Sequence, residues 1–445
     1  MRVLLISTYE LGRQPFGLAS PAAWLRNAGH DVSCLDASRQ PFDNADAFSD
    51  LIGFHLPMHT ATRLAVSMIE QIRRLNPAAR ICCYGLYAPL NGRFLRSLGV
   101  QHILGPEFER DLVGLANGFP IKEASESDRF TLPRLPFVTP DRTDLPALST
   151  YATLQKGSLR KVVGYTEASR GCKHFCRHCP VVPVYNGQFR LIPIDVVIDD
   201  VRAQVGRGAE HITFGDPDFF NGIRHAMRVV QALSTEFKGL TYDVTIKIEH
   251  LLRHRKVLPR LRETGCVLIT SAVESFDDDV LAVFRKGHTR ADVHTALEIC
   301  RQERLSVAPT FVPFTPWTTL EGYCTFLEEI ERLELIHQVS PIQLALRLLV
   351  PQGSLLADLP ELQPFLQPFD TKQLAYPWRH PDLRVDRCSD EIGALLGRRT
   401  NTPRHALFSE IWKLAHDQAG RSHKIRSTTS RGRAEVPYLN EPWYC

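Results

Sequence analysis

Short apolar segments alternate with helix-like segments along most of this 445-residue chain, and this alternation constrains the fold more than any other feature. Strand-like and helix-like runs succeed one another at a spacing that predicts βαβ units and a parallel, doubly wound sheet of the α/β class over residues 1–125. In chain order the runs are RVLLIS, PAAWLRNAG, VSCLD, LIGFHLP, RLAVSMIEQIRRL, ARICCYG, RFLRSLG and HILG.

A polar stretch punctuated by prolines interrupts the alternation and predicts a linker over residues 126–158. The alternation then resumes over residues 159–350, which predicts a partial or full βα barrel with its chemistry at the carboxyl ends of the strands. The predicted strands are KVVGYTEASRGC, HITFGDP, YDVTIKIEH, VLITSAVES, SVAPTFVPF and IQLALRLLVP. Residues 351–445, again rich in proline, are predicted to form a C-terminal extension with one amphipathic helix near His405–Gln418.

Composition and local sequence argue against a secreted, membrane-spanning or nucleic-acid-binding protein. The opening MRVLLISTYELG is interpreted as a first strand and not as a signal peptide, and no run reaches the roughly 18 apolar residues that a membrane span needs. Eleven cysteines, scattered apart from one cluster, are typical of a reducing compartment, so we expect a cytoplasmic protein. A net charge of +4 gives no reason to expect a nucleic-acid partner.

The cysteine cluster lies in EASRGCKHFCRHCPVVPVYNG, where Cys172, Cys176 and Cys179 form a CxxxCxxC pattern after a predicted strand. Three thiolates on one loop can hold an iron-sulfur cluster and leave one iron without a protein ligand. That iron can chelate a small molecule that carries an amine and a carboxylate. The pattern resembles the signature of the radical S-adenosylmethionine (SAM) superfamily, which implies a 4Fe-4S cluster and SAM. A zinc site with His174 or His178 as fourth ligand is the alternative interpretation.

The resemblance implies that three later segments bind SAM, each at the end of a predicted strand. Relatives bind the SAM amino group after the strand HITF, hold SAM with a carboxylate in the segment matching SAVES, and line the adenine with the segment matching VPFTPW. The residues concerned are Gly215, Asp216, Asp218, Glu274 and Pro313. Taken singly, each of the three carboxylates is better explained by strand-end capping or surface charge, and only their shared position at strand ends favours a role in binding.

Two further positions are candidates for cofactor binding. His178 stands where the family usually has an aromatic residue against the adenine, and an imidazole can stack there. Lys247 and Glu249 share a parity in IKIEH, which predicts one strand face that points either toward SAM or toward solvent as an ion pair.

The N-terminal sheet is similar to the cobalamin-binding domain of B12-dependent radical SAM enzymes. The resemblance implies a Rossmann-like, cobalamin-binding-type domain, with the corrinoid at the carboxyl edge of the strands. The candidate segments are Tyr9–Gly12, His55–Thr60 and Gly85–Tyr87. The DxHxxG motif that supplies a histidine ligand to cobalt is absent from the sequence, and a sheet that only covers the barrel is the alternative.

The remaining cysteines fall into two groups. Those in apolar strand or helix contexts are predicted to be buried: Cys34, Cys82, Cys83, Cys266, Cys300 and Cys324. Cys388 and Cys445 have polar or aromatic neighbours and are candidates for substrate thiols or further ligands. The tail EPWYC resembles radical SAM proteins with a Cys-Cys-Ala-Glu-Pro or Cys-selenocysteine-Ala-Glu-Pro ending, which predicts a UGA codon read through after Cys445.

The resemblance implies an enzyme, with a transferase as the expected class. Such an enzyme cleaves SAM reductively to methionine and a 5'-deoxyadenosyl radical, and cobalamin can relay a methyl group. It acts on a small molecule or peptide and needs an electron donor such as a flavodoxin or ferredoxin. Transfer of the 3-amino-3-carboxypropyl group of SAM to a thiol or metalloid is a second hypothesis, and a non-enzymatic metal-binding or regulatory protein is a third.

Overall fold

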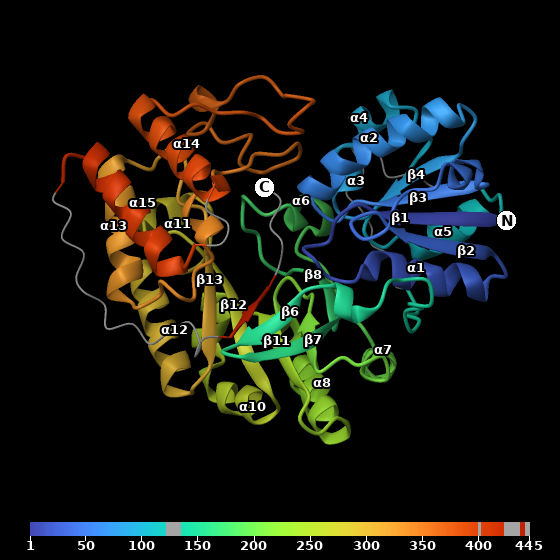
Figure 1. The fold of residues 1–445 in the computed structure, drawn as a ribbon, viewed down its shortest axis with the longest axis horizontal. Helices are drawn as coiled ribbons and strands as arrows, with labels where there is room; N and C mark the ends of the chain where they lie inside the picture. The colour runs from blue at the N-terminus through green and yellow to red at the C-terminus, as the bar shows by residue number, and fades with distance from the viewer. Residues whose placement is uncertain (122–134, 399–401, 422–436, 441–445) are drawn as a thin grey trace.

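The first sheet holds five parallel strands in the order β2-β1-β3-β4-β5, so the doubly wound sheet is confirmed (Figure 1). The computed structural model describes residues 1–121, 135–398, 402–421 and 437–440. The strands are β1 (Arg2–Ser7), β2 (Asp31–Asp36), β3 (Leu51–His55), β4 (Ile81–Tyr84) and β5 (His102–Ile103). The helices are α1 (Phe16–Asn27), α2 (His59–Leu75), α3 (Tyr87–Leu90), α4 (Gly92–Ser97) and α5 (Glu109–Ala116).

Helices cover both faces of this sheet, which explains why its strands are continuous apolar runs. On one face, Ile6 and Phe54 pack with α2 through Ile69. On the other face, Leu5 packs with α1 and α5 through residues such as Leu18. The strand order reverses between β1 and β3, and the carboxyl ends of these strands point toward the second sheet (Figure 1). Open α/β sheets bind ligands at this reversal.

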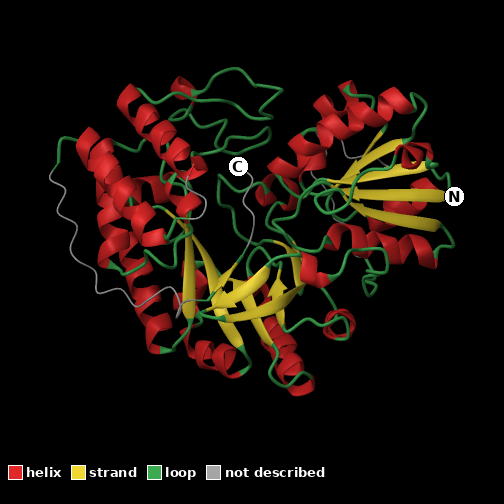
Figure 2. Cartoon of the chain, in the orientation of Figure 1, coloured by secondary structure: helices red, strands yellow, loops and turns green. Residues whose placement is uncertain are grey.

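The second sheet curves into a partial barrel around a core of its own (Figure 2). Its order is β13-β12-β11-β10-β7-β6-β14, and the five strands β7, β10, β11, β12 and β13 run parallel. The strands are β6 (Thr153–Lys156), β7 (Leu159–Thr166), β10 (His211–Phe214), β11 (Thr241–Thr245), β12 (Cys266–Glu274), β13 (Ser306–Phe311) and β14 (Tyr438–Leu439). The helices are α7 (Ile194–Val205), α8 (Ile223–Glu236), α9 (Ile248–Arg253), α10 (Leu258–Glu263), α11 (Asp278–Val283), α12 (Arg290–Gln302) and α13 (Leu320–Arg332).

Two strand predictions in this region are wrong. The run IQLALRLLVP forms a 3-10 turn (Pro341–Leu344) and isolated bridges at Arg347 and Pro351. The Gln343 side chain accepts the Phe311 backbone N–H at 2.8 Å, where a sixth strand would have paired with β13. The segment IKIEH is not a strand either, because β11 ends at Thr245 and α9 begins at Ile248.

The C-terminal extension contains the predicted helix, α15 (Arg404–Gln418), and a second one that prolines upstream had obscured, α14 (Leu383–Arg398). Cys388 lies on α14 and is fully buried, so the expectation of polar surroundings for it is wrong. The strand β14 pairs antiparallel with β6, whose residues lie in the predicted linker. Residues 441–445, including Cys445 and the predicted tail, lie outside the described residues. Among the described helices, none combines the length and apolar composition of a bilayer span.

Candidate active site

The cysteine loop, residues 172–179, lies between the two strands of a short hairpin at the carboxyl edge of the second sheet. The hairpin pairs β8 (Ser169–Gly171) with β9 (Phe189–Leu191), and α6 (Val181–Tyr185) follows the loop directly. The loop is tethered to the segment after β10, because Asn221 Oδ1 accepts the Lys173 backbone N–H at 3.3 Å and lies 3.8 Å from Cys172 Sγ. Nothing in the sequence predicted this role for Asn221, because only the fold brings it to the loop.

The three thiols of the loop lie close enough to influence one another. Burial raises the pKa of Cys179 to about 12, and the thiolate charges of Cys176 and Cys172 add to this effect. Burial likewise raises the pKa of Cys172. Thiols with raised pKa values lose their protons when a cationic iron or zinc centre binds them. The donor chemistry and the placement on one loop therefore fit an iron-sulfur cluster.

Lys247 contacts the cysteine loop although it does not lie on a strand. Its Nζ is 3.7 Å from Cys176 Sγ and 3.6 Å from Glu249 Oε2. Lys247 is the residue before α9, and Glu249 lies in the first turn of that helix. The Lys247 side chain is buried, and its ammonium group lies beside the thiols.

Glu274 joins the loop from the end of β12. Its Oε1 lies 3.1 Å from His178 Nε2 and 3.3 Å from Lys286 Nζ. Burial alone would raise the pKa of Glu274, but the charges of Lys286 and His178 lower it to about 2. The His178 ring also packs on Phe284, with centroids 4.7 Å apart. A carboxylate, an ammonium group and an imidazole therefore meet beside the loop, and of these Lys286 was not predicted.

The Asp216 side chain is hydrogen-bonded to other residues of the protein. Its carboxylate accepts hydrogen bonds from the Ala168 backbone N–H at 2.9 Å and from the Ser169 hydroxyl. Burial raises the pKa of Asp216 to about 6. Gly215 is also explained by packing, because a Cβ there would lie 1.7 Å from Tyr165 Oη. These contacts anchor the hairpin that carries the cysteine loop.

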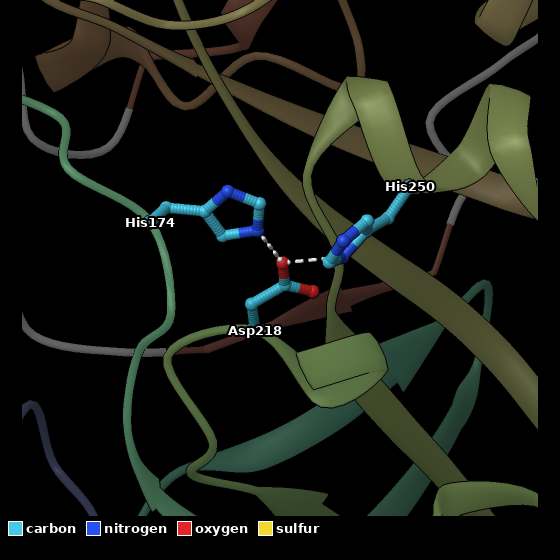
Figure 3. A group of neighbouring side chains, drawn as sticks. All are labelled: His174, Asp218 and His250. Carbon is cyan, nitrogen blue, oxygen red and sulfur yellow. Dashed lines mark hydrogen bonds and ion pairs between the residues drawn. The ribbon is translucent and has the colours of Figure 1, made fainter. Parts of the chain in front are cut away.

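Asp218 lies between two histidines, one from the loop and one from α9 (Figure 3). Its Oδ2 is 3.1 Å from His174 Nε2 and 2.6 Å from His250 Nδ1. Burial would raise the pKa of Asp218, but the hydrogen bond from His174 and the charge of His250 help to lower it to about 2. His250 was not predicted as a site residue, although it ends the quoted segment IKIEH.

Pro313 is buried after β13, and its carbonyl accepts a hydrogen bond from the Thr318 hydroxyl at 2.9 Å. Its predicted contact with the adenine stays a prediction. The zinc interpretation would use His174 or His178 on the cysteines. Both imidazoles instead face carboxylates, Asp218 and Glu274 respectively.

Helix α6, which follows the cysteine loop, contacts the carboxyl edge of the first sheet. Val184 and Tyr185 of α6 pack against Leu86 and Leu90 at α3. Burial raises the pKa of Tyr87, and the charge of the Cys179 thiolate raises it further.

A buried arginine strengthens this contact. Arg170, two residues before Cys172, pairs with Glu109 of α5 at 2.6 Å and with Glu167 at 2.9 Å. Its guanidinium also lies over the rings of Phe108 and Phe137. A cation on the cysteine-bearing hairpin is thus neutralised by a carboxylate of the N-terminal sheet domain.

Two buried polar atoms lack hydrogen bonds where the strand order reverses. Glu10 Oε2, after β1, and His55 Nδ1, at the end of β3, lie 3.6 Å apart, and neither has a hydrogen-bond partner in the described structure. The His55 ring is wedged against Gly17 and Gly85, which leave room for it by lacking a Cβ. Buried polar atoms without partners are rare and mark sites where a ligand or water can bind.

Comparison with protein families and known sequences finds one matching family model. Residues 166–321 match the radical SAM superfamily. The chain is 25% identical over 240 residues to a tRNA-2-methylthio-N(6)-dimethylallyladenosine synthase of Roseiflexus sp. (strain RS-1), covering 50% of this chain and 44% of the relative. It is 26% identical over 172 residues to the hopanoid C-3 methylase of Methylococcus capsulatus, covering 39% and 31%. The chain thus spans less than half the length of these curated relatives.

Solved structures resemble a larger part of the chain. A cobalamin-dependent S-adenosylmethionine radical enzyme, OxsB, with aqua-cobalamin bound, matches with a TM-score of 0.70 at 13% identity, covering 94% of this chain and 71% of that one. The radical S-adenosylmethionine methyltransferase TsrM of Kitasatospora setae, with tryptophan and a SAM analogue bound, matches with a TM-score of 0.60 at 15% identity, covering 75% and 71%. At these identities the likeness shows a shared fold.

Proposed function

We propose that this chain is a cobalamin-dependent methyltransferase. Residues 166–321 form a radical SAM domain, so the chain is an enzyme. Such a domain implies a 4Fe-4S cluster and SAM. The methyl group of SAM would pass by way of a corrinoid to a small molecule or peptide. The observation that carries this proposal is the contact between the N-terminal sheet domain and the hairpin that contains the cysteine loop, through α6 and the Arg170–Glu109 ion pair. A corrinoid at the first sheet and SAM at the cysteine loop would therefore be neighbours.

Cys172, Cys176 and Cys179 are the residues that would hold the cluster, and the cluster when bound supplies one open iron and an electron for SAM cleavage. Lys247 compensates negative charge at the Cys176 sulfur. Glu274, with Lys286 and His178, offers the charged partners that the ammonium and carboxylate of SAM need. Burial of these groups excludes water and strengthens their interactions.

A corrinoid fits the reversal point of the first sheet. Its peripheral amides can bond the buried Glu10 Oε2, which has no hydrogen bond in the described structure. The buried His55 ring is wedged in place, and His59 Nε2 contacts the Gln373 carbonyl at 2.6 Å. Contacts within the protein therefore engage both imidazoles, in agreement with the missing DxHxxG motif. The likeness to cobalamin-bound OxsB supports this assignment.

The test is product analysis of anaerobically reconstituted protein supplied with cobalamin, SAM and dithionite, which replaces the proposed flavodoxin or ferredoxin donor. Formation of S-adenosylhomocysteine together with 5'-deoxyadenosine supports the proposal. Methylthioadenosine would indicate aminocarboxypropyl transfer instead, and the absence of all three products would contradict both enzyme hypotheses. Glu10→Leu should reduce the corrinoid absorption band of the purified protein, whereas the exposed control Glu70→Leu should not.

A further inference from the structure

Three side chains at the cysteine loop lie close together in one cluster. His174 comes from the loop itself, Asp218 from the segment after β10, and His250 from α9 (Figure 3). One ligand atom of each lies within 4.8 Å of the others. The Asp218 and His250 side chains are fully buried, and the His174 side chain is 12% exposed.

The contact between His250 and Asp218 is close, but it does not have the geometry of a hydrogen bond. His250 Nδ1 lies 2.6 Å from Asp218 Oδ2, yet neither ring nitrogen of His250 makes a hydrogen bond within the described residues. A hydrogen bond requires the donor to point at the acceptor. Metal ligands point instead at a common third position. The buried His250 nitrogens therefore remain available as donors to a ligand beside Asp218.

His174 is oriented in the manner of a metal-bound histidine. Its Nε2 faces Asp218 at 3.1 Å, and its Nδ1 faces the Glu249 carboxylate at 3.9 Å. Histidines that bind metals commonly direct their second nitrogen toward a carboxylate, which fixes the ring and raises its basicity. Glu249 is held in turn by Lys247 and Arg253.

We propose that His174, Asp218 and His250 bind a divalent transition-metal ion of the Zn²⁺ type, separate from the cysteine site. Two imidazoles and one carboxylate form a donor set used for zinc, with a position left open for water. Donors that share a tetrahedral ion at bonds of about 2.0–2.1 Å lie about 3.3 Å apart. The observed separations of 2.6 and 3.1 Å require only a small expansion.

The ion would pin the cysteine loop to the barrel. His174 lies between Cys172 and Cys176, whereas the other two ligands belong to the β10 and β11 ends of the sheet. The same loop is already tethered by Asn221 at its start. A metal cross-link would add a second anchor in its middle, independent of whatever the cysteines hold.

The test uses the full chain with Cys172, Cys176 and Cys179 replaced by Ser, so that no loop thiolate can bind the probe. Co²⁺ is titrated and followed by absorption, and bound Zn²⁺ is counted by mass spectrometry. We expect one ion per chain, with ligand-field bands and no sulfur charge-transfer band. His174→Ala should weaken binding by about 100-fold or more, and Glu249→Gln by about tenfold.

The matched control is His254→Gln, whose ring lies 5.6 Å from that of His250 but outside the cluster. It should bind the ion as tightly as its parent, and circular dichroism checks that each variant is folded. Absence of binding in the serine protein would overturn the proposal. Equal binding by the His174→Ala and His254→Gln proteins would also overturn it. If the serine protein does not fold, the cysteine-containing chain is titrated instead, and an equal number of bound Co²⁺ ions in the wild type and the His174→Ala protein would overturn the proposal.

Discussion

Replacing Asp216 by Asn should stabilise the protein at neutral pH. Burial raises the pKa of Asp216 from 3.8 to about 6, so between these values the folded state keeps a proton that the unfolded chain has released. The stability of the wild type therefore falls as the pH rises through this window, by about 3 kcal/mol in total. Asn carries no charge at any pH and can still accept the Ala168 N–H bond.

The free energies of unfolding of the wild type and the variant should accordingly be nearly equal at pH 4. Above pH 7 the Asp216→Asn protein should be more stable by about 3 kcal/mol. Urea unfolding of the cofactor-free chain between pH 4 and 8 measures this difference in stability. The exposed control Asp195→Asn should show no such pH dependence. A variant less stable than the wild type at pH 8 would refute the reasoning, because the hydrogen bonds of Ala168 and Ser169 would then outweigh the cost of burying the charge.

Three other substitutions test the contacts around the cysteine loop. Arg170→Met leaves Glu109 buried without its cation, so it should cost about 3–5 kcal/mol and separate the two sheets into distinct transitions in scanning calorimetry. Glu274→Gln should lower the free energy of unfolding by about 3 kcal/mol at pH 7, since the pKa of Glu274 is about 2, and this loss should disappear as the pH falls from 4.5 toward 2 in urea titrations. Lys247→Met should make the reduction potential of the proposed cluster more negative in a titration followed by electron paramagnetic resonance, because a positive charge beside the thiols is lost.

The parallel sheets could be predicted because strands covered on both faces are continuous apolar runs between helical segments. The predicted sixth barrel strand failed because apolar content does not reveal pairing. The Gln343 side chain takes the Phe311 N–H that such a strand would have needed. The hairpin of β8 and β9 was missed because strands of three residues leave no periodic signal. Helix α14 was missed because nearby prolines suggested an irregular chain.

In the candidate site, too, local sequence patterns predicted some residues, whereas the packing of the fold brings in others. The cysteines are adjacent in sequence, and Glu274 is recognisable because it ends an apolar strand, so local patterns locate them. His250 ends a segment that was predicted as a strand but forms α9, and Lys286 follows α11, so only the packing of the barrel brings them to Asp218 and Glu274. Sequence spacing therefore identified the loop but not the charged groups that surround it.

Electron paramagnetic resonance of the reduced, anaerobically reconstituted protein, recorded with and without SAM, tests the central claim most directly. Three cysteine ligands leave one iron open, so we predict a 4Fe-4S signal that SAM shifts and that is lost in Cys176→Ala. A signal that SAM leaves unchanged, or a purified protein that holds only redox-silent zinc on the cysteines, would contradict this account.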